Sequence, residues 1–140
     1  MERSEKLDLF GDGPWMDEPD QLDFESHGFA CMVRRNMSTG VLCGYVALPD
    51  GHALRDVPEE ALRDELFVHG GITLVGGLQD DPTDSYWLGF DAAHGCDYSP
   101  IWGRYGKPEP ELLETYRTVA YMSGECVQLA AQLAAVPAAN

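Results

Sequence analysis

The chain has 140 residues, a length typical of a single domain that can bury a core without disulfide bonds. Its 9 basic and 24 acidic residues give a formal net charge of −15, and a field of this sign repels phosphate backbones, which disfavours direct binding to DNA or RNA. No apolar run reaches the roughly 20 residues that span a bilayer, and no signal-peptide pattern opens the chain. We therefore expect a cytoplasmic protein that has no membrane partner.

The first 25 residues differ in composition from the rest of the chain. They carry nine acidic and two basic side chains, together with the turn-rich stretch 11–14. This composition predicts an acidic, partly flexible N-terminal segment over 1–25, part of which docks through apolar residues such as Phe10 and Trp15. A single domain is expected over 26–136, followed by a tail over 137–140.

Short apolar runs predict strands in the first half of this domain. The runs 29–33 and 41–48 are joined by turn-forming residues over 36–40, which is typical of a β-hairpin. The run 41–48 is almost continuously apolar, which favours a central strand covered on both faces. Two further strands are predicted over 72–75 and 86–90.

Two helices are predicted, a short one over 56–66 and a long one that begins near Pro110 and ends before Pro137. In the long segment, apolar side chains recur every three or four residues, at Leu112, Tyr116, Val119, Met122, Cys126, Leu129 and Leu133. This spacing is typical of one apolar stripe on a helix of roughly 25 residues. The expected fold class is α+β, with a small antiparallel sheet packed against a long C-terminal amphipathic helix.

The strongest candidate site follows the strand over 86–90, where Asp91, His94 and Asp97 recur every three residues. In a tight loop these side chains converge on one side. Imidazole and carboxylate groups suit Zn²⁺, Mn²⁺ or Fe²⁺, and they equally suit general acid–base catalysis. The alternative is structural, with Asp91 and Asp97 capping turns and His94 as their partner.

A second candidate segment is His69-Gly70-Gly71, which precedes a predicted strand. Glycines free the backbone of Cβ atoms and let a ligand approach the main chain, so we expect Gly70 and Gly71 to contact a ligand. We interpret His69, together with Asp91, His94 and Asp97, as the candidate catalytic set. Alternatively, the glycines only form a bulge and His69 is a packed, hydrogen-bonded ring.

Three further residues are candidates for the same site. His52 follows the central strand and is a candidate metal ligand with His69, His94 and Asp91, unless it is an exposed turn histidine. A water bound to such a metal could attack a phosphate or an amide. Arg35 could hold a carboxylate or a phosphate, unless it pairs with local acids. Trp87 is also expected to contact the ligand. The four cysteines are expected to be reduced thiols.

The segment His69-Gly70-Gly71-Ile72-Thr73, combined with Gly89-Phe90-Asp91-x-x-His94-x-x-Asp97, resembles a family of small phage proteins of uncharacterised activity. The resemblance covers about residues 30–133. It implies a phage origin and action in the cytoplasm of an infected bacterial host. It assigns no activity to any residue.

Two hypotheses of different kinds follow. In the first, a phage-encoded accessory protein uses its His/Asp site to bind, and in one version to hydrolyse, a small polar ligand that is nucleotide-like or metal-bound. In the second, the protein is an acidic, non-enzymatic inhibitor of a host protein, of the anti-defence or DNA-mimic type. The sequence leaves open the choice between enzyme and binder, and it leaves the oligomeric state open as well.

Overall fold

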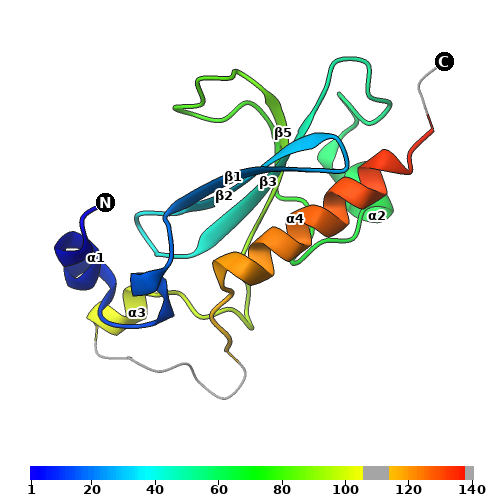
Figure 1. The fold of residues 1–140 in the computed structure, drawn as a ribbon. Helices are drawn as coiled ribbons and strands as arrows, with labels where there is room; N and C mark the ends of the chain where they lie inside the picture. The colour runs from blue at the N-terminus through cyan, green and yellow to red at the C-terminus, as the bar shows by residue number, and fades with distance from the viewer. Residues whose placement is uncertain (106–113, 138–140) are drawn as a thin grey trace.

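The structure is a computed structural model that describes residues 1–105 and 114–137. In this part of the chain, five antiparallel strands form one sheet in the order β1-β2-β3-β5-β4, and helix α4 crosses one face of it (Figure 1). The strands are β1 (Gln21–Ser26), β2 (Phe29–Arg35), β3 (Leu42–Leu48), β4 (Leu74–Gly76) and β5 (Tyr86–Asp91). The helices are α1 (Arg3–Phe10), the 3-10 helix η1 (Pro14–Asp17), α2 (Glu59–Glu65), α3 (Ile101–Arg104) and α4 (Val119–Ala134). The expected α+β class is confirmed.

The predicted hairpin is formed by β2 and β3. Its turn is held by the Asn36 side chain, whose Oδ1 accepts hydrogen bonds from the backbone N–H groups of Ser38 (2.8 Å) and Thr39 (3.2 Å). Gly40 follows with φ of 82°, a conformation that costs glycine little. Most residues of β3 are buried, as expected for a strand inside the sheet.

The main core lies between the sheet and α4. Met122, Cys126, Leu129 and Leu133, four residues of the predicted apolar stripe, are at most 1% exposed. They pack against the side chains that β2, β3 and β5 direct to the same face.

The four cysteines lie in the described residues and are free thiols. Of the helices that the structure describes, none is long and apolar enough to cross a membrane.

Helix α4 begins at Val119, so the prediction of helix over 114–118 is wrong. Thr115 instead lies beside the loop that follows β5. Its N–H donates to the carbonyl of Cys96 (2.8 Å), and its own carbonyl accepts from the N–H of Tyr98 (2.9 Å). The Thr118 hydroxyl then accepts from the N–H of Tyr121 (3.1 Å) and caps the helix. Pro110 and Leu112, the predicted start of the helix, lie outside the described residues.

Residues 1–25 contain α1, η1 and most of β1. Phe10 and Trp15 are at most 2% exposed and form a second apolar cluster with Met16 and Tyr98. Strand β1 pairs with β2 at one edge of the sheet. Helix α1 and strand β1 were not predicted, because α1 is largely polar and β1 carries only a short alternation, with Leu22 and Phe24 between polar residues.

Candidate metal centre

His69 lies in a turn between α2 and β4. The carbonyl of Val68 accepts from the N–H of Gly71 (2.9 Å), and Gly70 has φ of 70°, which suits the third position of a type II turn. The backbone N–H of His69 donates to Glu125 Oε1 of α4 (2.8 Å). Helix α4 therefore fixes where this turn sits.

The carboxylates of Asp91 and Asp97 shape the loop after β5. Asp91 Oδ1 accepts from the N–H of Ala93 (3.1 Å), and Asp91 Oδ2 accepts from the Thr73 hydroxyl beside β4 (2.9 Å). Asp97 Oδ2 accepts from the N–H of His94 (3.1 Å), while the N–H of Asp97 donates to the carbonyl of His94 (2.9 Å). Both acids thus hold turns, as the structural interpretation of this motif expected, and these turns bring the His94 ring toward Asp97.

The two segments meet at Asp97. His69 Nε2 is 2.9 Å from each oxygen of Asp97, and His94 Nδ1 is 3.7 Å from Asp97 Oδ2. One ligand atom each from His69, His94 and Asp97 can be chosen so that all lie within 4.8 Å of one another. Asp91 stands beside this group, with its Oδ1 3.5 Å from His94 Nδ1. The side chain of Asp97 is 1% exposed and that of His94 is 39% exposed, so the cluster opens to solvent on the His94 side.

Side chains around the cluster hold two of its members in place. The Tyr121 hydroxyl is 2.9 Å from His69 Nδ1, and Arg117 Nε donates to Asp97 Oδ1 (2.8 Å). The Arg117 guanidinium also lies over the Tyr121 ring, 5.1 Å from its centroid. Arg117 and Tyr121, which contact Asp97 and His69 respectively, therefore also support each other.

Electrostatics favour a charged Asp97. Burial alone would raise the pKa of Asp97, but hydrogen bonds from His69, Arg117 and the backbone N–H of His94 outweigh it and hold the pKa below its ordinary value. Burial, and then the nearby Glu125 carboxylate, raise the pKa of Tyr121, so its phenol stays protonated at neutral pH. An ionised, buried carboxylate beside two imidazoles offers donor atoms for a metal ion, while Arg117 already balances part of the carboxylate's charge.

Gly70 is in direct contact with the cluster. A Cβ atom built on Gly70 would overlap the imidazole ring of His94, so this ring rests on the bare main chain of the turn. Gly71 differs, because a Cβ there would meet only Arg63, at 3.6 Å. Because Gly70 has no side chain, the ring of His94 can pack against the main chain of the turn. The prediction had placed a ligand in this position.

His52, predicted as a metal ligand, lies away from this cluster. Its Nε2 is 3.0 Å from the carbonyl of Leu133, at the C-terminal end of α4, and its Nδ1 accepts from the N–H of Leu54 (3.1 Å). Both ring nitrogens are therefore engaged elsewhere. The sheet explains the separation, because β3 and β5 are antiparallel and their C-terminal ends point in opposite directions.

Arg35 and Trp87, predicted to bind the ligand, also lie elsewhere. Arg35 is 3% exposed, and its guanidinium donates to Asp20 Oδ1 (2.8 Å), to the Gly40 carbonyl (2.8 Å) and to the Tyr116 hydroxyl (2.9 Å). Local acids thus occupy it, which was the alternative interpretation. Trp87 is buried on the sheet face opposite α4, where its indole N–H donates to Asp81 Oδ2 (2.8 Å).

Arg117, Tyr121 and Glu125 were not predicted from the sequence as residues of the site. The four-residue spacing of Tyr121 and Glu125 places both on one face of α4, the face that meets His69. This spacing was the available signal. The spacing alone does not show whether this face of α4 contacts the turn at His69 or faces solvent.

Two histidines and one carboxylate are a ligand set found with Zn²⁺ and with Fe²⁺. Tetrahedral zinc with bonds of about 2.0–2.1 Å places its ligand atoms roughly 3.4 Å apart, so the side chains here need only small adjustments. The contact of Tyr121 with the second nitrogen of His69 matches the supporting hydrogen bond that metal-binding histidines commonly make. Three protein ligands would leave further positions open on the solvent side, near His94.

Fold and site together define a small α+β protein with a candidate His–His–carboxylate metal centre. Comparisons with protein-family models, with curated protein sequences and with solved structures found no match.

Proposed function

We propose that this is a phage-encoded accessory protein that binds a divalent metal, Zn²⁺ in preference to Mn²⁺ or Fe²⁺, through His69, His94 and Asp97. The observation that carries the proposal is the convergence of these three ligand atoms, within 4.8 Å, from two segments distant in the sequence. Zn²⁺ is favoured because imidazole is its common ligand and three protein ligands are typical of zinc sites that keep an open position.

In this proposal the chain's own groups have separate tasks. His69 is oriented by Tyr121 and His94 by its seat on Gly70, while Arg117 anchors the buried carboxylate of Asp97. The open side near His94 would receive a small polar ligand. A bound metal would offset part of the −15 charge that otherwise repels a nucleotide-like anion, and it would activate water for hydrolysis.

The test is zinc binding by calorimetry, with metal content measured after dialysis. We expect one equivalent of Zn²⁺ for the wild-type protein and a loss of at least about tenfold in affinity for His69→Gln, His94→Gln and Asp97→Asn. His52→Gln is the matched control, because it removes an imidazole outside the cluster and should leave affinity unchanged. Failure of the wild-type protein to bind Zn²⁺, Mn²⁺ or Fe²⁺, or equal binding by all variants, would contradict the proposal.

The second proposal is an acidic, non-enzymatic inhibitor of a host protein. It is favoured by exposed acids that are not part of the cluster, namely Asp23 and Glu25 on β1 and Asp80 and Asp84 in the loop before β5. Two other acids of the N-terminal segment, Glu18 and Asp20, contribute less to such a surface, because they form ion pairs with Arg35. The two proposals separate cleanly, since an inhibitor acting through these acids needs no metal at His69.

A further inference from the structure

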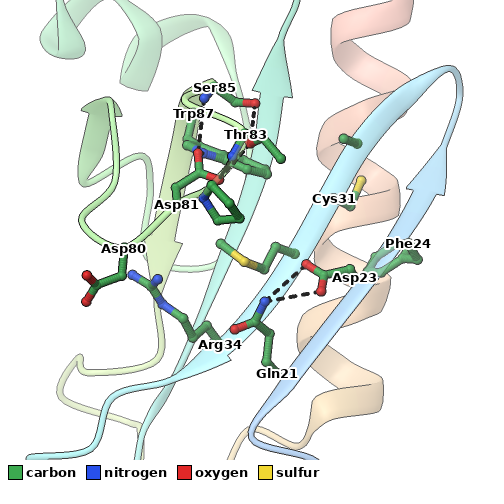
Figure 2. A pocket seen from close by; sticks show the side chains of 13 residues that line it. Gln21, Asp23, Phe24, Cys31, Arg34, Asp80, Asp81, Thr83, Ser85 and Trp87 are labelled. Carbon is green, nitrogen blue, oxygen red and sulfur yellow. Dashed lines mark hydrogen bonds between the residues drawn. The ribbon is translucent and has the colours of Figure 1, made fainter.

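A pocket of about 290 Å³ lies on the face of the sheet opposite α4, between strands β1 and β2 and the loop over 77–85 (Figure 2). It shares no residue with the metal cluster. Its volume is near the lower end of the range for ligand sites, about 300–1,000 Å³. A ligand that fits here is therefore small.

The lining of the pocket is mostly apolar. Ala30 and Met32 come from β2, and Trp87 comes from β5. Met32 and Trp87 also pack with Tyr45 in an apolar cluster separate from the main core. This face of the sheet can receive a flat or aliphatic body and remove its surface from water.

The wall contributed by the loop is held in shape by Asp81. Its Oδ1 accepts from the N–H (3.0 Å) and the hydroxyl (2.6 Å) of Thr83, and its Oδ2 accepts from the N–H of Ser85 (3.0 Å) and the indole N–H of Trp87 (2.8 Å). Figure 2 shows these bonds converging on the one carboxylate. A wall fixed in this way needs little ordering when a ligand binds, which favours affinity.

The charged side chains of the lining are predominantly negative. Asp23 from β1 and Asp80 and Asp81 from the loop face one positive residue of the lining, Arg34. Arg34 reaches the loop, where it donates to the carbonyl of Gln79 (3.4 Å), and in Figure 2 its guanidinium lies on the Asp80 side of the pocket. The carboxylate of Asp23 accepts only from the exposed amide of Gln21 (3.1 Å) among its described hydrogen bonds, so it can accept from a ligand.

We propose that this pocket is a second binding site, for a small organic cation with a flat apolar body. The body lies against Met32, Ala30 and Trp87, and the cationic group lies against the carboxylate of Asp23. The net charge of −15 adds to the attraction for cations. The inference is independent of the metal centre, since neither site supplies a residue to the other.

Three probes of one shape test the charge preference, namely benzamidine (cation), benzamide (neutral) and benzoate (anion). The readout is the indole N–H resonance of Trp87 in a ¹H–¹⁵N correlation spectrum of the full chain, assigned by its loss in Trp87→Phe. We expect benzamidine to shift this resonance saturably in the millimolar range. Benzamide should bind at least about fivefold more weakly than benzamidine, and benzoate more weakly still.

Two kinds of variant locate the site. Asp23→Asn should weaken benzamidine binding by about fivefold, whereas Asp12→Asn, an exposed acid elsewhere, should not. Ala30→Phe should abolish binding, because Ala30 is exposed in the pocket and a phenyl ring there fills the space without entering the core. Ala134→Phe, an equal change on the exposed end of α4, should bind normally.

Three results would overturn the inference: no shift with benzamidine up to about 10 mM, equal binding of the neutral probe, or unchanged binding by Ala30→Phe in a variant whose spectrum shows the native fold.

Discussion

Gly70 links the two halves of the metal cluster at the scale of a single residue. Its φ of 70° permits the turn that carries His69, and its bare Cα supports the ring of His94. Gly71 has a similar φ of 81° but no imidazole against it. The pair therefore separates two effects of an added methyl group, which are backbone strain and displacement of His94.

We predict that Gly70→Ala and Gly71→Ala each lose roughly 1–2 kcal/mol of unfolding free energy, because an alanine at positive φ is strained. Gly70→Ala should lose more than Gly71→Ala, and only Gly70→Ala should weaken zinc binding, since its Cβ pushes the His94 ring away from Asp97. Urea unfolding and zinc titration of both variants measure the two effects. Equal zinc affinity in the two variants would show that His94 does not depend on Gly70.

The residues of the cluster were predicted from two local patterns, the Asp91-x-x-His94-x-x-Asp97 spacing and the His69-Gly70-Gly71 motif. Asp91, His94 and Asp97 share one loop, so their spacing was informative. The position of His52 relative to the cluster could not be predicted from spacing, because it depends on which strands are neighbours in the sheet and in which direction they run. Leu48, at the end of β3, pairs with Tyr86 at the start of β5, so β3, which His52 follows, and β5, which Asp91 ends, finish at opposite ends of the sheet.

At the scale of elements, the first turn of α4 is capped from two sides. The Thr118 hydroxyl accepts from the N–H of Tyr121, and Glu18 Oε2 accepts from the N–H of Val119 (2.7 Å). Glu18 belongs to the N-terminal segment, and its carboxylate also accepts from the hydroxyl of Tyr116 and from Arg35. Burial raises the pKa of Tyr116, so its phenol stays protonated and can donate. A charge from residue 18 thus stabilises the positive end of a helix that begins 101 positions later.

We predict that Glu18→Gln lowers the free energy of unfolding by about 1–3 kcal/mol, because it removes charge-assisted hydrogen bonds at a partly buried helix terminus. Thr118→Ala should cost about 1 kcal/mol, the usual value for a lost cap. Urea unfolding followed by circular dichroism measures both. Asp12→Asn, an exposed acid in the same segment, is the control and should stay within about 0.5 kcal/mol of the wild-type protein. An effect of Glu18→Gln no larger than that control would contradict the capping role.

The helix itself was predictable from its apolar stripe, but its start was not. Tyr116 continues the spacing of the stripe, yet its ring packs against Trp15 in the second cluster, with ring centroids 5.2 Å apart. The backbone N–H and carbonyl of Thr115 form hydrogen bonds with the loop after β5. The periodicity of apolar residues does not predict such a contact between distant segments. Thr118, a good N-cap residue, was the local signal for the true start.

At the scale of the whole molecule, a buried ionic cluster ties residues 1–20 to the sheet and to α4. Lys6 Nζ lies 2.8 Å from Asp20 Oδ1, and Arg35 Nε lies 2.8 Å from the same oxygen. Lys6 and Arg35 are at most 4% exposed. Removing the partner of a buried charge is strongly destabilising, so this segment belongs to the folded unit and is not a detachable acidic tail.

Asp20 also gives the whole molecule a defined response to acid. Burial alone would raise the pKa of Asp20, but hydrogen bonds from Lys6 and Arg35 outweigh it and bring the pKa below its ordinary value of 3.8. A carboxylate whose pKa is lower in the folded state contributes stability above the pKa of the unfolded chain. That contribution is lost as the pH falls through the folded-state pKa.

We therefore predict that Asp20→Asn is less stable than the wild-type protein at pH 7, and that the difference stays constant down to about pH 5 and shrinks at lower pH. Urea unfolding at pH 7, 5, 4 and 3 measures this. Asp97 has a lowered pKa as well, but it is present in both proteins and cancels in the comparison. Asp12→Asn makes the same change in net charge without these contacts, so subtracting its effect isolates the ionic cluster from general repulsion in a chain of net charge −15. A difference that persists undiminished at pH 3 would mean that Asp20 stabilises the fold by its shape and hydrogen bonds rather than by its charge.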